Sequence, residues 1–494
     1  MLKKKKHNSN LIFIGSHDNL ITTVLLALPI ASFAEPLFFY LIALLSEVVN
    51  SPGSTNMSNI KHLSKKEFWI MTIAGFCSMC IEGLMDSVRS VTFPLIKEHF
   101  DASYEEFGVL NSMANVGYVV FASLCSVVLP YIGFKNGMII GSVAGIILSI
   151  WLSYAPSFLW CIIIQFLFGI CFGFGDIPPQ TLGTMIFTEK SGFFMALLNA
   201  FYGVGCMLGP LLAGIILTYV PYGYQGVYLI MTALILILGL VITFSKFTIF
   251  SMTDAQEESE KLLDPQTSDI ENGKEKPGSE TMKEDEQQQK KCCNIKNPVI
   301  RAAFKPTVML FIITLTMLTL VERSGMNWSG VYIKDYLHMD PEKEGAMFNT
   351  IYFALYTVTR LFGGLLTDKL GAMNTIYCTL ILTMILLLIG FFTDVVGLWI
   401  ICSTGALVSL FWPSFIIVST DYFGEEGTAA VGAILPLQSL VAAIFQPILG
   451  WFNSLWGAAW SFRFTFVFAS CALLLLFVIS CLIKKKKSSQ EVTH

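Results

Sequence analysis

The chain reads EFGVLNSMANVGYVVFASLCSVVLPYIG at residues 106–133 and EGAMFNTIYFALYTVTRLFGGLLTDKLG at residues 344–371. An acid, an amide, a tyrosine and a glycine recur 238 positions later, as Glu106, Asn111, Tyr118 and Gly133 are matched by Glu344, Asn349, Tyr356 and Gly371. A similar offset relates GPLLAG, which begins at Gly209, to QPILGW, which begins at Gln446. Because each piece lies in a long apolar run, the repeat indicates a membrane protein built from two similar halves.

The composition is that of a protein in lipid. Apolar residues make up 54% of the 494 residues, and only 13% are charged, whereas a soluble domain carries about 25% charged residues. The net charge of -4 gives no reason to expect a nucleic-acid partner. The 12 cysteines show neither a metal-ligand nor a disulfide spacing. We therefore expect no metal site and interpret the cysteines as small apolar residues.

Apolar windows long enough to cross a membrane occur throughout the chain. A hydrocarbon core about 30 Å thick needs about 20 apolar helical residues. Such windows begin near Phe68, Phe107, Gly137, Phe158, Phe193 and Val227 in the first half, and near Thr307, Ala346, Thr375, Val396, Thr428 and Phe462 in the second. The sequence predicts an all-α membrane protein whose twelve transmembrane helices form two pseudo-symmetric six-helix bundles, an architecture typical of secondary transporters.

The predicted domain boundaries follow changes in composition. The five parts are an N-terminal cytoplasmic segment (1–66), an N-terminal six-helix bundle (67–250), a disordered cytoplasmic linker (251–303), a C-terminal six-helix bundle (304–483) and a cytoplasmic tail (484–494). The linker is too polar to bury a core. Residues 20–49 are apolar enough for a further span or a signal peptide. A second start at Met57 leaves open whether the upstream segment is a gene-model extension or a dispensable leader.

The distribution of lysine predicts the orientation in the membrane. Cytoplasmic loops carry an excess of basic residues. With the N-terminus inside, most basic clusters fall on the cytoplasmic side, including Lys61, Lys65, Lys66, Lys135, Lys190, Lys246, Lys290, Lys291, Lys296, Lys369 and residues 484–487. Both termini are therefore predicted to be cytoplasmic. No address signal selects one membrane, so the plasma membrane is the default location.

A short motif after the eighth span connects the chain to a known family. GLLTDKLG at residues 364–371 resembles the G-x-L-x-D-[RK]-x-G loop signature of the major facilitator superfamily. Its glycines suit a tight turn between close helices, and its acid could sit at a helix N-terminus or pair with a base. The gating motif that this resemblance implies consists of Gly364, Asp368, Lys369 and Gly371. The equivalent loop of the first half keeps Gly133 but has no acid.

Two further motifs of this superfamily have counterparts here. GCMLGPLLAG in the fifth span resembles the superfamily motif G-x-x-x-G-P-x-x-[AG]-G, which predicts close helix packing and a bend. The helix-packing motif consists of Gly205, Gly209, Pro210 and Gly214. In the fourth span, Gln165 stands where many proton-coupled members carry arginine. This departure weakens any proton mechanism that requires the arginine.

Within the superfamily, the chain is most similar to the branch of fucose/proton symporters and sodium-dependent glucose transporters. Four features carry this resemblance: GLMD at residues 83–86 followed by Pro94, GFGD at 173–176, LNAFYG at 198–203, and Glu322 with Trp328. The resemblance to the superfamily covers residues 67–484. The branch's asparagine in span four is Pro179 or Gln180 here, and its histidine in span five is Asn199.

Acids inside the spans are the first candidates for functional residues. A charged side chain near the bilayer centre costs about 2.5–3.5 kcal/mol on insertion scales, so Asp86, Asp176 and Glu322 each require a reason. Asp86 shares a helix face with Glu82 and Arg89. These three side chains form either a neutralised ladder near the outer mouth or a site where Asp86 binds solute hydroxyls or the coupling proton.

The other two acids also have two interpretations each. Asp176 precedes Pro178 and Pro179, which either bend the span towards a central cavity or end it and leave the acid at the cytoplasmic edge. Glu322 and its neighbours form either a rim salt bridge or a ligand contact. The residues of this polar and aromatic patch are Glu322, Arg323, Asn327 and Trp328.

A sugar site would require aromatic faces and pairs of hydrogen-bonding groups. The spans offer aromatic rings at Trp328, Trp412, Tyr352, Tyr356 and Tyr202, and amides at Asn111, Gln165, Gln180, Asn199, Asn327 and Gln438. Any single ring could equally fill space between helices or face lipid.

These features predict a secondary active carrier of a small neutral polar solute, such as a hexose. We expect alternating access in the lipid bilayer, coupled to a proton or sodium gradient through Asp86 and Asp176, with a monomeric protein and no cofactor. No Walker A or nucleophile motif occurs, so no enzymatic activity is expected. One alternative is an exporter or exchanger of organic anions, amino acids or drugs, for which Arg89, Arg323 and Arg360 would supply buried bases. Another is a transporter-like receptor or scaffold that moves nothing.

Overall fold

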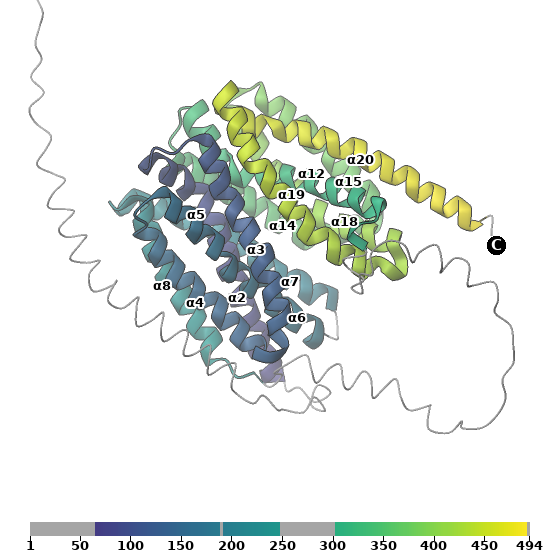
Figure 1. Cartoon of the computed structure of the whole chain (residues 1–494), viewed down its shortest axis with the longest axis horizontal. Helices are drawn as coiled ribbons and strands as arrows, with labels where there is room; N and C mark the ends of the chain where they lie inside the picture. The colour runs from purple at the N-terminus through teal and green to yellow at the C-terminus, as the bar shows by residue number, and fades with distance from the viewer. Residues whose placement is uncertain (1–64, 188–190, 248–301, 492–494) are drawn as a thin grey trace, which may run out of the picture. The chain divides into compact units, whose positions relative to one another are not determined.

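The computed structural model describes residues 65–187, 191–247 and 302–491, which contain helices and no strand (Figure 1). The helices of the first half are α2 (Lys65–His99), α3 (Tyr104–Ile132), α4 (Phe134–Ser153), α5 (Phe158–Leu167), α6 (Gly169–Ile186), α7 (Ser191–Tyr219) and α8 (Gly223–Phe244). Those of the second half are α12 (Pro306–Asn327), α13 (Ser329–Val331), α14 (Ala346–Leu370), α15 (Ala372–Phe391), α16 (Asp394–Cys402), α17 (Thr404–Val408), α18 (Phe411–Phe423), α19 (Gly427–Trp456) and α20 (Trp460–Glu491). Two π-helical turns, η3 (Tyr332–Tyr336) and η4 (Pro341–Gly345), precede α14, and a 3-10 turn, η5 (Gly424–Glu426), precedes α19.

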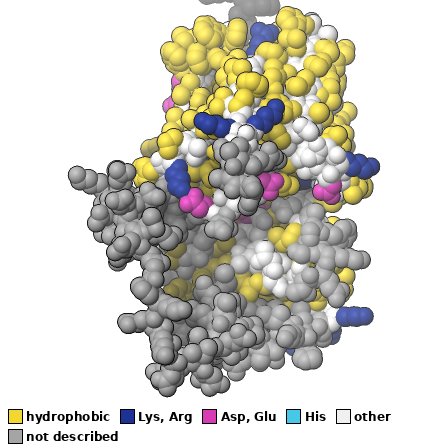
Figure 2. Space-filling view, turned by 90° about the vertical axis from the view of Figure 1, so that its right-hand side faces the viewer, with side chains coloured by type: hydrophobic (Ala, Val, Ile, Leu, Met, Phe, Trp, Pro, Cys, Tyr) yellow, Lys and Arg dark blue, Asp and Glu magenta, His cyan; other side chains and the backbone are white. Residues whose placement is uncertain are grey.

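The lengths of these helices suit a membrane. Among the described residues, 11 helical stretches are long and apolar enough to cross one, with α5 and α6 counted as one span and α16 to α18 counted as another. The twelfth predicted span coincides with α14, which has 25 residues but carries Arg360, Asp368 and Lys369. Figure 2 shows a face on which hydrophobic side chains predominate and charged side chains gather mainly in a band. The predicted all-helical membrane fold is confirmed.

The helices form two bundles, drawn from purple to teal and from green to yellow in Figure 1. In the first bundle α2 packs against α6, α7 and α8, and in the second α12 packs against α19 and α20. The main helix pairs that join the bundles are α3 with α19 and α7 with α14. The repeated stretches lie in α3 and α14, and the repeated proline motifs lie in α7 and α19. Each half therefore contributes the same two helices to the interface.

The residues that recur between the halves hold equivalent structural positions. Gly133 ends α3 with φ 79°, and Gly371 ends α14 with φ 81°. Glycine adopts this left-handed conformation without the steric cost of a Cβ. The amides of Asn111 and Asn349 each donate to the carbonyl four residues earlier, at 3.2 and 2.9 Å. The sequence repeat thus reports a structural repeat.

Several glycines lie where another helix backbone approaches closely. A Cβ at Gly108 in α3 would lie 2.4 Å from the carbonyl oxygen of Gln446 in α19, so only glycine permits this contact. In α7, a Cβ at Gly205 or Gly209 would collide with α2, and one at Gly214 would lie 2.6 Å from the Cβ of Ala346. Pro210 lies inside α7. The helix-packing motif therefore lies against both α2 and the opposite bundle.

The gating motif differs from its expected arrangement. A Cβ at Gly364 would have no neighbouring atom within 4 Å among the described residues, so this glycine does not bring two helices together in this conformation. Asp368 lies two residues before the end of α14 rather than at a helix N-terminus, and no ion pair joins it to a base in the described part of the chain. Neither role expected for Asp368 is present in this conformation.

Other sequence predictions fall at or beyond the limits of the described residues. Helix α20 continues to Glu491. The predicted boundary between the C-terminal bundle, which ends at residue 483, and the tail therefore falls inside a helix. The predictions for residues 1–64 and for the linker up to residue 301 lie outside the described residues.

Replacing Gly108 by alanine should loosen the contact between α3 and α19, because the added Cβ meets the backbone of Gln446 and Pro447. We expect a loss of about 1–3 kcal/mol in the free energy of unfolding, measured on detergent-solubilised protein. Gly364→Ala is the matched control, since its Cβ enters open space and alanine favours a helix by about 1 kcal/mol. Equal stability losses in the two variants would contradict this account.

Candidate functional site

A cavity of about 520 Å³ lies between the two bundles. Its walls come from α2, α3, α6 and α7 of the first bundle and from α12, α14, α18 and α19 of the second. This volume is within the range of sites for small solutes, about 300–1,000 Å³. The lining contains acids, bases, amides, hydroxyls and aromatic rings, so polar groups face the cavity although it lies inside a membrane protein.

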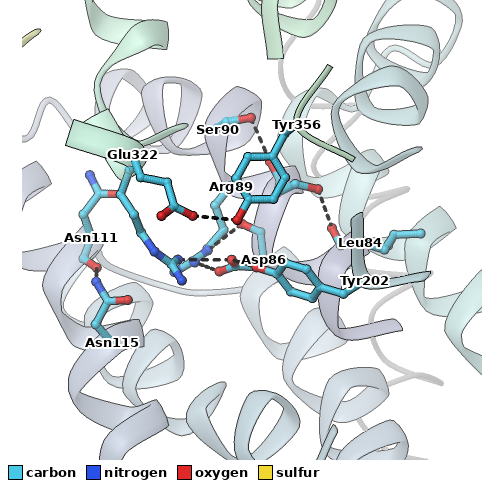
Figure 3. A network of polar contacts seen from close by, with 11 residues as sticks. Leu84, Asp86, Arg89, Ser90, Asn111, Asn115, Tyr202, Glu322 and Tyr356 are labelled. Atoms are coloured by element: carbon cyan, nitrogen blue, oxygen red, sulfur yellow. Dashed lines mark hydrogen bonds and ion pairs between the residues drawn. The ribbon is translucent and has the colours of Figure 1, made fainter. Parts of the chain in front are cut away.

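Asp86 is the centre of a hydrogen-bonded network in this cavity (Figure 3). Its carboxylate forms an ion pair with Arg89 on the same helix, and it accepts a hydrogen bond of 2.7 Å from the Tyr202 hydroxyl of α7. Arg323 of α12 donates to the same carboxylate at 3.2 Å. Asp86 is 6% exposed. The charge of Asp86 is therefore neutralised, as the interpretation of a neutralised ladder requires. The acid also lines the cavity, as the interpretation of a binding site requires.

The pair formed by Asp86 and Arg323 joins the two halves of the chain. The two residues are 237 positions apart, and they lie on the first helix of each half. An acid in one half and a base in the other therefore form an ion pair between the bundles.

Asp176 lines the same cavity from α6. It accepts hydrogen bonds from the Tyr118 hydroxyl at 2.7 Å and from the Gln180 amide at 2.5 Å. Pro178 and Pro179 lie inside α6, which continues to Ile186. The interpretation in which the prolines end the span is wrong, because the helix runs on for two further turns and Asp176 faces the cavity.

The two repeated tyrosines have the same role in their respective halves. Tyr356 donates a hydrogen bond of 2.7 Å to the Glu322 carboxylate (Figure 3), as Tyr118 does to Asp176. The acids are not equivalent, since Asp176 lies in the fourth span and Glu322 in the seventh. Each half thus presents one tyrosine-bonded carboxylate to the cavity, from a different helix.

Arg360 brings a guanidinium group to the second half of the cavity. Its guanidinium carbon lies 5.1 Å from the ring centroid of Tyr356 and 6.0 Å from that of Trp412. No ion pair joins it to an acid of the residues that the structure describes. The face of Trp412 and this cation are therefore adjacent in the cavity wall.

The predicted site residues divide into those at the cavity and those away from it. The structure places six of them in the cavity lining, Asp86, Asp176, Asn199, Glu322, Trp412 and Gln438, and Gln180 contacts the lining through Asp176. Four others lie outside the lining, Asn111, Gln165, Asn327 and Trp328. These four are buried in contacts between and within helices.

Trp328 shows why a polar aromatic patch can be misjudged from sequence. Helix α12 ends at Asn327, and the indole of Trp328 is fully buried. Its ring lies 5.1 Å from that of Phe107 in the opposite bundle, and its nitrogen donates to Gln446 at 2.9 Å. Trp328 therefore packs the bundle interface instead of offering a face to a solute.

One face of α3 also lines the cavity and is absent from the predicted site. It carries the polar residues Asn115, Tyr118 and Ser126, with Ala122 between the last two, and their spacing places them on one helix face. Polar residues at this spacing within an apolar span are a sequence signal for such a wall.

The bundles also meet at the end where α2 finishes and α3 begins. Glu98 forms an ion pair with Lys334 of η3, and the Tyr104 hydroxyl donates to Asp335 at 2.9 Å. These contacts lie on the side that the lysine distribution predicts to be external. At the opposite end, most side chains of α14 from residue 361 to 370 are exposed. Among the described residues, the ion pair of Glu98 with Lys334 and the hydrogen bond of Tyr104 with Asp335 therefore join the bundles at the end predicted to be external.

Removing Asp86 should destabilise the protein, because Arg89 and Arg323 would be left without their shared carboxylate. We expect Asp86→Ala to lower the free energy of unfolding by about 3–5 kcal/mol, measured by unfolding in detergent. The double variant Asp86→Ala/Arg323→Met should recover part of this loss, since it removes one unpaired charge. Asp368→Asn, at an exposed acid, is the control and should have no effect. Equal losses in the single and double variants would argue against the ion pair.

Comparisons with known proteins agree with this architecture. A family model described as Major Facilitator Superfamily matches residues 75–434, with a second match at 324–493. Organic cation/carnitine transporter 7 of Arabidopsis thaliana is 22% identical over 153 residues, which are 31% of this chain and 30% of that relative. The chain thus aligns with less than a third of this relative's length.

Solved structures show the same fold. A bacterial homolog of the human lysosomal transporter Spinster, in an inward-facing and unoccupied conformation, has a TM-score of 0.64 at 14% identity, covering 86% of this chain and 99% of its own. Its inward-facing and occupied form has a TM-score of 0.59 at 14% identity, covering 85% and 98%. At this identity the similarity concerns the fold alone.

Proposed function

Because this chain belongs to the major facilitator superfamily, we propose that it is a secondary active transporter of a small neutral polar solute, such as a hexose. The observation that supports this best is the composition of the cavity wall. Its carboxylates bond mostly to groups of the protein, whereas amides, hydroxyls and an indole face remain for a solute. A polyhydroxylated ring matches such a wall through paired hydrogen bonds and an apolar face.

Two amides of the wall, Asn199 and Gln438, use their nitrogens as donors within the protein. Asn199 uses its nitrogen to donate to the Met195 carbonyl at 2.9 Å, and Gln438 donates to the Ser439 hydroxyl at 2.8 Å. Gln438 Oε1 is buried, and no group among the described residues donates to it. These two residues come from opposite bundles, α7 and α19. A solute with two hydroxyls, one donating to each amide oxygen, would connect the bundles.

Transport requires the two bundles to rearrange around the cavity. In the alternating-access mechanism of such two-part carriers, one bundle rocks against the other and exposes the site to each side in turn. The contacts of Glu98 with Lys334 and of Asp86 with Arg323 cross between the bundles, so they must separate when the closed end opens. We propose that a proton or a sodium ion drives this cycle, as in the fucose and glucose branch that the sequence resembles.

The proposed placement in the membrane rests on the sequence. We propose bundles at 67–250 and 304–483, joined by a cytoplasmic linker at 251–303, with both termini in the cytoplasm. The end at which Glu98 meets Lys334 would then face outside. The plasma membrane is the proposed location, and the protein is proposed to act as a monomer.

One observation favours a second candidate, the transport of organic anions. Arg360 presents a guanidinium group beside Tyr356 and Trp412, and no ion pair with an acid of the described residues neutralises it. A carboxylate of a solute could bind this cation in a bidentate manner. A hexose does not need this charge, whereas an organic anion does.

Uptake of labelled hexoses into proteoliposomes under imposed proton and sodium gradients tests the proposal. We expect gradient-driven accumulation, and we expect Trp412→Ala to raise KM about tenfold by removing a stacking face, a loss of about 1.4 kcal/mol in binding. Trp451→Ala is the matched control, because Trp451 is exposed and lies outside the cavity lining. Equal effects of the two substitutions would contradict the assignment of Trp412.

The same vesicles separate the alternatives. Uptake of labelled organic anions that Arg360→Gln abolishes, with no uptake of hexoses, would establish the second candidate. Binding of a solute to the purified protein without flux under any gradient would indicate a receptor or scaffold.

A further inference from the structure

Glu82 is a buried acid of the cavity that the proposed function does not yet use. It lies on α2 one turn before Asp86, lines the cavity, and is 8% exposed. Its Oε2 atom is buried and has no hydrogen-bond partner among the described residues. A buried ionised carboxylate with an unpaired oxygen is costly, and a bound proton removes the charge.

The other two acids that line the cavity from the first bundle differ from Glu82 in this respect. Asp86 receives two guanidinium groups and the Tyr202 hydroxyl, all of which stabilise its anion. Asp176 receives the Tyr118 hydroxyl and the Gln180 amide. Hydrogen bonds to the charged form of an acid favour that form. Asp86 and Asp176 therefore have several donors to their carboxyl oxygens, whereas Glu82 Oε2 has none among the described residues.

Helix packing fixes the position of Glu82. The Ser78 hydroxyl, one turn earlier on α2, donates to the Gly175 carbonyl of α6 at 2.9 Å. A Cβ at Gly175 would lie 3.4 Å from the Cβ of Glu82, so the stem of Glu82 lies directly on α6. The carboxyl of Glu82 therefore lies near Asp176, the residue that follows Gly175 on α6.

Charged and titratable groups from several elements surround Glu82. Its charged neighbours on other helices are Asp176 of α6 and Arg323 of α12. The other groups that interact with it electrostatically are Cys171 of α6, Tyr118 of α3, and Tyr202 and Cys206 of α7. Asp86 and Arg89 lie on its own helix. Among these neighbours Arg323 belongs to the opposite bundle, so its distance from Glu82 changes when the bundles move.

We propose that Glu82, rather than Asp86 or Asp176, is the proton-binding group of the cavity. The proton comes from water on one side, forms an O–H bond on the carboxyl of Glu82, and returns to water on the other side. Arg323 controls the affinity, since the cation favours release when it is near and favours binding when it has withdrawn with α12. The position of the proton site is argued from the contacts of Glu82. The coupling of this proton to movement of a solute rests on the proposed function.

Infrared spectroscopy tests the proton site without any solute. The purified full-length protein is reconstituted in liposomes and stepped in pH, and the C=O stretch of a protonated buried carboxyl is recorded. We expect this band in the wild type, its loss in Glu82→Gln, and its retention in Asp86→Asn and Asp176→Asn. In Arg323→Gln the band should persist to higher pH. A wild type without the band, a band retained in Glu82→Gln, or a band lost only in Asp176→Asn would overturn the proposal.

Transport in the same liposomes distinguishes this proposal from the proposed function. Glu82→Gln should retain exchange of labelled hexose across membranes with equal hexose concentrations on both sides, because the neutral amide is a close match in shape for the protonated acid. It should lose accumulation driven by a proton gradient, because the amide cannot bind and release the proton. If the wild type carries no hexose but shows the Glu82 band, the solute assignment fails and the proton assignment stands. If the wild type accumulates hexose with sodium alone and shows no such band, the proton assignment fails and the carrier stands.

Discussion

The polar contact between the bundles at the cavity depends on one charge pair, the ion pair between Asp86 and Arg323. Charges inside a bilayer are stable only when they are paired or hydrated, and here each half supplies one member of the pair. The contact therefore holds the first helix of each half against the other, and the cavity forms around it. The tyrosines, amides and aromatic rings of the wall are arranged about this centre.

The repeat also explains why the cavity is not symmetric. Duplication preserved Tyr118 and Tyr356 as donors to cavity acids, and it preserved the glycine caps at Gly133 and Gly371. The acids themselves come from different helices, and the ion pair between the first helices of the two halves has the acid Asp86 on one side and the base Arg323 on the other. Two copies of one scaffold thus present different chemistry to the two sides of a bound solute.

The sequence predicted the fold well because the pattern of apolar windows and the repeat are properties of the chain alone. It also identified Asp86, Asp176 and Glu322, since an acid in an apolar run has few structural explanations. It could not predict the partner of Asp86, because Arg323 is 237 residues away and only the packing of the halves brings them together. It misplaced Trp328 for the same reason, since the neighbour that covers its ring is Phe107 of the other half.

The interface between the bundles has a consequence for the speed of transport. At Gly108 and Gly214 the helices touch through bare backbone and small atoms, so no large side chain interlocks at these two contacts, in contrast to the rings of Phe107 and Trp328. Tightly interdigitated surfaces move only when many side chains change rotamer together, which raises the activation barrier. The glycine contacts avoid this requirement. The turnover of the carrier would then be limited by breaking the polar contacts between the bundles and by separating the rings of Phe107 and Trp328.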